Sequence, residues 1–249
     1  MSTRSAFRRA RLHVMLALAV CVATAGLLAA PGLAGAAPSP TQIKARAQLY
    51  TITWGTHTVL TGTLMDTSTI TALGGLWLRV EVSPTGSPAS WTLFSTVTTE
   101  NEAQYATGQY TQVAQPRRLT YYRFVFLGNA AYAATFSNTV VIRVRPFVGR
   151  PMVPMTVKAG KLFIVRGSLK PRFPAGAKTV TIKAYRSKGG KWVLVKRLRA
   201  TNVDTVKYTK YRVTTRFTKK GKYRFRAFTP TMPGWAPGKS TFSKVLVVK

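Results

Sequence analysis

Few side chains in this sequence have the chemistry for acid–base catalysis or metal binding. The chain contains 2 His and 5 Asp or Glu residues among 249. A serine-type triad would need His57 as its base and Asp66, the nearest acid in sequence, to orient it. No Gly-x-Ser-x-Gly elbow accompanies these two residues. We therefore interpret His57 as a surface residue in a turn.

Glu100 and Glu102 form the second candidate pair, by residue type suited to glycoside hydrolysis or calcium binding. Their spacing of two residues places both on one side of an extended strand and neither across a cleft. Calcium also requires more oxygen ligands than two carboxylates supply. We interpret the pair as part of a solvated loop. Residues 148–249 hold no His, no Cys and the single carboxylate of Asp204, so we predict no enzyme activity, no cofactor and no metal site.

The N-terminal segment has the three-part layout of a secretory signal peptide. An apolar run over residues 14–30 leads to the small residues Ala34-Gly35-Ala36, and four arginines precede it: Arg4, Arg8, Arg9 and Arg11. We predict a signal peptide over residues 1–36, with cleavage between Ala36 and Ala37. The product would be secreted, extracellular or associated with the cell wall. Retention of the apolar run as an uncleaved anchor stays open as an alternative.

The only cysteine of the chain, Cys21, lies inside this apolar run. Removal of the signal peptide would leave no cysteine at all. That composition excludes disulfides, cysteine-ligated metals and thiol nucleophiles from the remainder. Stability must then come from packed cores, and about 100 residues per domain can form one.

Residues 37–147 and 148–249 look like two copies of one domain. At an offset of 101, Trp91 matches Trp192, and Tyr122-Arg123-Phe124 matches Tyr223-Arg224-Phe225. The same offset pairs Tyr110 with Tyr211. Further matches at offsets of 105 and 106 join residues 60–64 to 165–169 and Phe136-Ser137 to Phe242-Ser243. Ordered matches over most of both segments indicate an internal duplication.

The hydrophobic pattern of both copies predicts β-strands. Apolar and polar residues alternate over 76–82, 180–184 and 223–227, which is the period of a half-buried strand. Turn residues such as Pro84-Thr85-Gly86 and Gly189-Gly190 separate the runs. No segment after residue 36 keeps a helical period. Short strands with regular turns predict β-sandwiches, and the cluster of Pro and Gly at 146–154 predicts the connector.

The chain resembles the bacterial immunoglobulin-like tandem-domain secreted proteins of actinobacterial type. The resemblance rests on the Gly-x-Leu after the first strand, the mid-domain Trp, the Tyr-Arg-Phe strand and the Ser-x-x-Val closing strand, and it covers nearly all of residues 37–249. It implies an all-β fold with two tandem immunoglobulin-like β-sandwiches after the signal peptide. It also implies extracellular display, spacing or adhesion. The disulfide of antibody domains has no counterpart here.

Positive charge distinguishes the two copies. Residues 37–147 hold 8 basic and 4 acidic residues, whereas residues 148–249 hold 26 basic residues and one acid. Alternation places many of these cations on the outer side of strands. If the strand at 210–217 pairs with the strand at 223–227, four arginines share one sheet face. The predicted anion-binding residues are Lys196, Arg197, Arg199, Lys210, Arg212, Arg216, Lys219, Lys220, Lys222, Arg224 and Arg226.

Such a surface favours polyanions, and arginine suits phosphate and carboxylate groups. We expect an exported, non-enzymatic protein whose second domain binds an anionic wall glycopolymer or polysaccharide. An anionic membrane surface remains open, as does nucleic acid held without sequence specificity. The alternative function is a structural or adhesive protein that docks an acidic partner protein through the basic face. Trp192 and Trp235 are candidates for stacking on sugar rings or bases, with core packing as the alternative for each.

Overall fold

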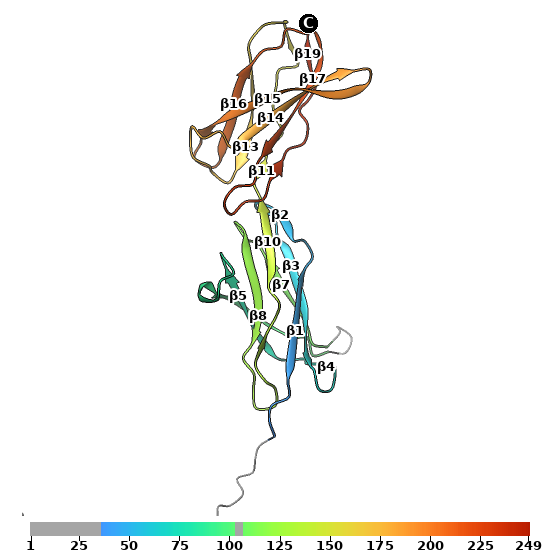
Figure 1. Cartoon of the computed structure of the whole chain (residues 1–249), viewed down its shortest axis with the longest axis vertical. Coiled ribbons are helices and arrows are strands. Elements are labelled where there is room, and N and C mark those ends of the chain that lie inside the picture. Colours follow the sequence, from blue (N-terminus) through green and yellow to red (C-terminus); the bar gives the residue numbers. More distant parts are fainter. Residues whose placement is uncertain (1–35, 103–106) are drawn as a thin grey trace, which may run out of the picture. The chain divides into compact units, whose positions relative to one another are not determined.

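The structure is a computed structural model that describes residues 36–102 and 107–249 (Figure 1). It confirms the prediction of an all-β chain, since one short 3₁₀ turn (η1, Pro88–Ser90) is the only helical element among these residues. None of the described helices is long and apolar enough to span a bilayer. The signal peptide predicted over residues 1–36 lies outside the described residues except for Ala36. Ala36 and Ala37 are exposed and precede the first strand.

Strands β1 to β10 pair only with one another and form the first sandwich. They are β1 (Thr41–Ala47), β2 (Thr51–Thr53), β3 (Thr58–Asp66), β4 (Thr71–Ala72), β5 (Trp77–Ser83), β6 (Thr92–Thr98), β7 (Gln109–Ala114), β8 (Thr120–Phe126), β9 (Thr135–Phe136) and β10 (Val140–Arg145). One sheet has the order β1-β3-β4 with β7 also on β3, and the other has the order β2-β10-β8-β5-β6. These orders correspond to the A-B-E and A′-G-F-C-C′ sheets of an immunoglobulin-like domain.

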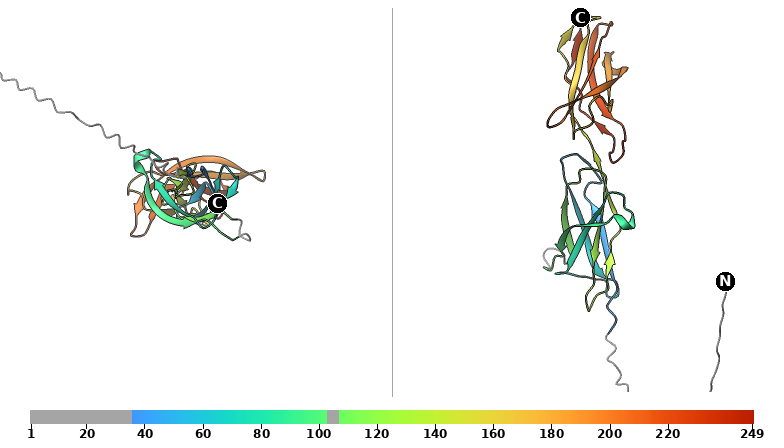
Figure 2. Two further views of the ribbon diagram at one scale, coloured as in Figure 1. Left: turned by 90° about the horizontal axis from the view of Figure 1, so that it is seen from below. Right: turned by 90° about the vertical axis from the view of Figure 1, so that its left-hand side faces the viewer.

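The second sandwich consists of β11 to β19 and repeats this arrangement (Figures 1 and 2, yellow to red). Its strands are β11 (Phe147–Val148), β12 (Thr156–Val157), β13 (Phe163–Lys170), β14 (Val180–Lys188), β15 (Lys191–Asp204), β16 (Thr209–Thr215), β17 (Gly221–Thr229), β18 (Gly238–Lys239) and β19 (Leu246–Val248). The 14-residue β15 pairs with β14 through its first part and with β16 through its last part. Because β15 crosses from one layer of the sandwich to the other, all nine strands are hydrogen-bonded into one continuous sheet.

Each sandwich has its own core between its two sheets. In the first, Ile43, Leu60 and Leu64 of one sheet meet Leu78 and Phe124 of the other. In the second, Val165, Leu169 and Tyr211 meet Ile182, Phe225 and their neighbours. The alternation predicted for 180–184 and 223–227 is confirmed, since every second residue of these runs is buried. Inward apolar side chains thus account for the strand pattern seen in the sequence.

The matched residues of the two copies make the same contacts. Ser137 accepts a hydrogen bond from the Phe124 amide at 3.0 Å, and Ser243 accepts one from the Phe225 amide at 2.9 Å. Both serine hydroxyls donate to the carbonyl of the residue that follows them. Both β5–β6 and β14–β15 carry an irregularity in register at equivalent positions, between Val80 and Glu81 and between Ala184 and Tyr185. These repeated details support the inferred duplication.

Candidate anion-binding surface

Most strand cations of the second sandwich occupy outer positions, as the alternation predicted. On β16, Lys210 and Arg212 are exposed while Tyr211 between them is fully buried. On β17, Arg224 and Arg226 are half-buried and alternate with the buried Tyr223, Phe225 and Ala227. Most of the positive charge therefore lies outside a core that resembles that of the first sandwich.

The prediction that four arginines share one face is wrong. Strand β16 pairs with β13 and β15, whereas β17 pairs with β14, β18 and β19. In an immunoglobulin-like order, the consecutive strands E and F belong to opposite sheets, so the chain crosses the sandwich between them. Arg212 faces outward from one sheet, opposite Arg166 of β13, while Arg224 and Arg226 face outward from the other. Arg216 follows the end of β16 and belongs to neither ladder.

The remaining predicted residues are divided between a turn and strand β15. Lys219 and Lys220 are exposed in the turn before β17, where Tyr223 Oη donates to the Lys219 carbonyl at 2.6 Å. Lys222 lies just inside β17. On β15, Arg197 and Arg199 face outward, but Lys196 lies on the opposite side of the strand. Its Nζ donates to Thr215 Oγ1 at 3.2 Å.

One sheet face concentrates cations and aromatic rings, and we call it the β14–β15–β17 face. Arg226 lies opposite Lys183, and Lys183 lies opposite Arg197, so three cations stand side by side across three strands. Neighbouring strands are about 4.8 Å apart, so these charges are close enough to repel one another. The cations of this face are Lys183, Arg197, Arg199, Lys222, Arg224 and Arg226.

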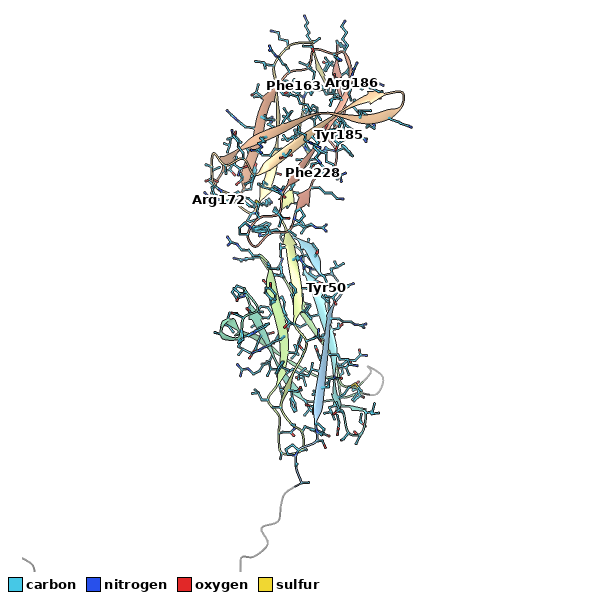
Figure 3. The ribbon with its side chains drawn as sticks, in the orientation of Figure 1. Tyr50, Phe163, Arg172, Tyr185, Arg186 and Phe228 are labelled. Carbon is cyan, nitrogen blue, oxygen red and sulfur yellow. The ribbon has the colours of Figure 1, made fainter. Side chains whose placement is uncertain are left out.

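Aromatic rings pack directly against the cations of this face. The Arg224 guanidinium carbon lies 4.3 Å from the centre of the Trp192 ring and 3.8 Å from that of Phe242. Lys183 Nζ lies 4.4 Å from the centre of the Phe228 ring. Figure 3 labels Phe228 of β17 and Tyr185 of β14, and the Tyr185 ring meets Phe242 edge to face at 5.5 Å. These contacts hold the cations in defined places and add favourable cation–π energy.

Sequence reasoning missed four members of this face: Lys183, Tyr185, Phe228 and Phe242. Lys183 stood at an outward position of a predicted strand, and Phe242 opened a repeated Phe-Ser anchor. Neither signal showed that Lys183 lies opposite Arg226 or that the Phe242 ring lies against Arg224. Trp235 is 8% exposed and belongs to a buried apolar cluster, which removes it as a stacking candidate. Trp192 is half-buried beneath Arg224.

The single acid of the second sandwich offsets little of this charge. Asp204 pairs with Arg172, which donates from Nε to Oδ1 at 3.1 Å and from Nη2 to Oδ2. The hydrogen bond from Arg172 lowers the pKa of the Asp204 carboxyl, so the group stays ionised at neutral pH. Both side chains are well exposed, and Asp204 lies at the end of β15, away from the paired positions of Lys183 and Arg224.

The candidate catalytic residues of the first sandwich do not come together. His57 is exposed in the turn before β3, and Asp66 is the last residue of that strand. Nine extended residues separate the two by roughly 30 Å. Asp66 accepts hydrogen bonds from the amide and hydroxyl of Ser68, and the Ser68 side chain lowers the pKa of this carboxyl. Glu100 and Glu102 are exposed after the end of β6, in a loop as predicted.

The same face of the first sandwich has a different chemical character. The register aligns Arg79, Glu81, Arg123 and Val125 with Lys183, Tyr185, Arg224 and Arg226. Across the hairpin, Thr96 and Thr98 align with Arg197 and Arg199. One acid and five uncharged or basic positions of the first copy thus correspond to a face without any acid in the second.

Comparisons with known proteins give structural likenesses only. No protein family model matches the chain, and no curated protein does. A D1–D4 ectodomain fragment of ICAM-5 is similar at 13% identity with a TM-score of 0.39, over 84% of this chain and 53% of the fragment. The FN1–FN3 domains of chicken CNTN1 are similar at 13% identity with a TM-score of 0.27, over 85% of this chain and 66% of that one. The chain spans about half the length of the ICAM-5 fragment. Its assignment as immunoglobulin-like follows from the strand order described above.

Proposed function

We propose that this chain is an exported, non-enzymatic binding protein whose basic second sandwich associates with anionic polymers of the cell envelope or its surroundings. The observation that supports this most directly is the difference between two equivalent faces. On the first copy, Arg123 pairs with Glu81. On the second, six cations gather without an acid beside them.

The cost of this arrangement supports a binding role. Like charges opposite one another on neighbouring strands destabilise a sheet. Lys183 has a cation opposite it on both sides, and Arg166 faces Arg212 in the other sheet. A polyanion bound on the β14–β15–β17 face would relieve the repulsion around Lys183, so folding and binding would favour each other.

Binding to a defined polyanion tests the proposal. Dextran sulfate is a suitable probe because uncharged dextran is its matched control. We expect the full chain to bind dextran sulfate in 50 mM NaCl and to leave uncharged dextran unbound. Affinity should fall by about 100-fold or more between 50 and 200 mM NaCl. Binding releases counterions from the polyanion, and this release becomes less favourable as the salt concentration rises.

Two outcomes would count against the proposal. If the chain fails to bind dextran sulfate in 50 mM NaCl, its basic surface does not serve polyanion binding. If the protein is instead retained on cell-envelope material unchanged in 1 M NaCl, a packed contact with an acidic partner protein becomes the better explanation.

A further inference from the structure

The first sandwich contains a complete carboxylate–guanidinium pair on its outer face. Arg123 donates from Nε to Glu81 Oε2 at 2.8 Å, and its Nη2 lies 2.7 Å from the same oxygen. Arg79 approaches the other oxygen, Oε1, at 3.6 Å. Glu81 is 8% exposed, which corrects the expectation from strand alternation that it faces solvent. The carboxylate is thus enclosed between two arginines.

An aromatic pair holds Arg123 in place. Its guanidinium carbon lies 4.5 Å from the centre of the Trp91 ring and 5.8 Å from that of Phe136. The planar group therefore has ring contacts on its faces and directs its N–H edge toward Glu81. The Nε and Nη2 atoms of that edge both approach Glu81 Oε2, and hydrogen bonds between charged groups of this kind are shorter and stronger than neutral ones.

In the second sandwich the arginine and its rings are kept, but the carboxylate is replaced. Arg224 takes the place of Arg123, with Trp192 and Phe242 in place of Trp91 and Phe136. Tyr185 stands opposite Arg224 where Glu81 stands opposite Arg123. A neutral phenol cannot compensate a guanidinium charge. Asp204, the one acid of this sandwich, is engaged by Arg172.

The Nε of Arg224 is buried without a hydrogen-bond partner. The Nε atoms of Arg79 and Arg186 share this condition, so it is the loss of the carboxylate that distinguishes Arg224. The surrounding positions have changed in the same direction. Val125 of the first copy corresponds to Arg226, and Lys183 keeps the cation of Arg79.

We infer that Arg224, flanked by Lys183 and Arg226, is a binding position for the carboxylate of a uronic acid unit in an anionic polysaccharide. The inference rests on the proposed function and names the ligand class of the same surface. The pairing of Glu81 with Arg123 in the first sandwich shows that a carboxylate fits against an arginine that packs on aromatic rings.

A polysaccharide suits this face better than an acidic protein segment. Arg226, Lys183 and Arg197 form a row with one cation per strand, which matches a polymer that carries a charge on each sugar. The half-buried rings of Tyr185 and Phe228 lie beside these cations and add apolar surface to the face. A protein segment would have to supply carboxylates at the same regular spacing.

Polygalacturonate and its fully methyl-esterified form are the probes, since they share a backbone and differ in free carboxylates. We expect the full chain to bind polygalacturonate and to bind the ester at least 10-fold more weakly. Arg224→Gln should weaken polygalacturonate binding about 10-fold or more. Arg212→Gln removes the same charge from the opposite sheet and should weaken it less than 3-fold. Both variants should weaken dextran sulfate binding to a similar, small extent.

A second variant pair inserts the carboxylate instead. Tyr185→Glu recreates the carboxylate–arginine pair of the first copy. The new carboxylate would pair with Arg224 and compete with the ligand, so polygalacturonate binding should fall at least 10-fold. Thr214→Glu adds the same charge on the exposed side of β16 and should have a smaller effect. Tyr185→Glu should melt at or above the wild-type temperature, which keeps the test informative if Arg224→Gln does not fold.

Three results would overturn the inference. Equal losses for Arg224→Gln and Arg212→Gln, with dextran sulfate still bound by the wild type, would reject the Arg224 position and leave the proposed function standing. Equal affinity for polygalacturonate and its ester would reject carboxylate recognition. Binding of polyglutamate as tightly as polygalacturonate would assign the position to an acidic polypeptide. Failure of the wild type to bind any polyanion would reject the proposed function itself.

Discussion

Tyr211 of β16 lies directly opposite Gly167 of β13, and its hydroxyl passes over that glycine to donate to the Gly149 carbonyl at 2.7 Å. Gly62 and Tyr110 stand in the same relationship in the first sandwich, where Tyr110 Oη donates to the Lys44 carbonyl at 2.7 Å. In each copy the tyrosine ties the first strand to the middle of its sheet. The glycine is needed because the ring occupies the space of a side chain.

Substitution of this glycine should therefore destabilise the fold. A Cβ at position 167 would lie 2.2 Å from Tyr211 Oη and 2.3 Å from Cζ, which no real side chain tolerates. We expect Gly167→Ala to lower the free energy of unfolding by about 1–3 kcal/mol, the usual cost of overpacking a core. Chemical unfolding followed by circular dichroism measures it. Gly176→Ala is unsuitable as a control because of its positive φ, so Ala177→Ser at a half-buried turn position serves instead.

The same tyrosines should make stability depend on alkaline pH. Burial raises the pKa of Tyr211 well above its usual value near 10, because the ionised phenolate would lose its hydration. The unfolded chain then releases this proton at lower pH than the folded chain does. The stabilisation is complete below about pH 10 and decreases as the pH rises further.

Tyr211→Phe tests this dependence. The variant loses the hydrogen bond to Gly149, which should lower the unfolding free energy at pH 7 by about 1 kcal/mol. Above pH 10 its stability should fall less steeply than that of the wild type, by up to about 1.4 kcal/mol per pH unit. Tyr208→Phe, at a half-buried position before β16, is the matched control. An unchanged alkaline slope in Tyr211→Phe would show that this phenol does not contribute.

Sequence patterns predicted the strands and the repeat because both depend on local alternation and on residues kept at fixed offsets. Gly62, Tyr110 and their counterparts recur since the contact between them requires both partners. Pairing between strands is a property of the whole sandwich, and for that reason the partner of β16 was predicted wrongly. Adjacent strands in sequence are often neighbours in a sheet, but this connection crosses between sheets.

The candidate surface was predicted only in part for the same reason. Arg224 and Arg226 were found from alternation, which fixes the side of a strand. That Lys183 lies opposite Arg226 follows from the register of β14 on β17, and the Phe242 ring reaches Arg224 from the segment between β18 and β19; alternation determines neither. The replacement of Glu81 by Tyr185 could not be found from the sequence either. The offset between the two copies changes in this region, and no repeated motif there shows which residues correspond.

The buried pair of the first sandwich should be needed for its stability. Glu81→Gln keeps the shape of the side chain but removes the charge that Arg123 and Arg79 share. Two arginines would then face each other without compensation, and we expect a loss of about 1–3 kcal/mol in unfolding free energy. Glu100→Gln, at an exposed loop position, is the control and should change stability by less than about 0.5 kcal/mol. Equal effects of the two substitutions would contradict the structural role of Glu81.

Ionic strength should affect the stability of the chain through its second sandwich. Lys183 has Arg226 and Arg197 as opposite neighbours, and Arg166 faces Arg212, so repulsion acts within both sheets. Added salt shortens the Debye length from about 30 Å at 0.01 M to about 10 Å at 0.1 M, so the summed repulsion among the exposed cations weakens as salt rises. We therefore expect the melting temperature to rise by several degrees between 20 and 300 mM NaCl, as measured by differential scanning calorimetry.

Removing one charge from the row separates screening from general salt effects. Lys183→Gln leaves Arg226 and Arg197 without a cation between them, so it should raise the melting temperature in 20 mM NaCl and reduce the dependence on salt. Lys178→Gln, at an exposed position before β14, removes the same charge outside the row and should alter the salt dependence less. Identical salt curves for the two variants in NaCl would mean that the row adds no repulsion beyond the net charge of the sandwich.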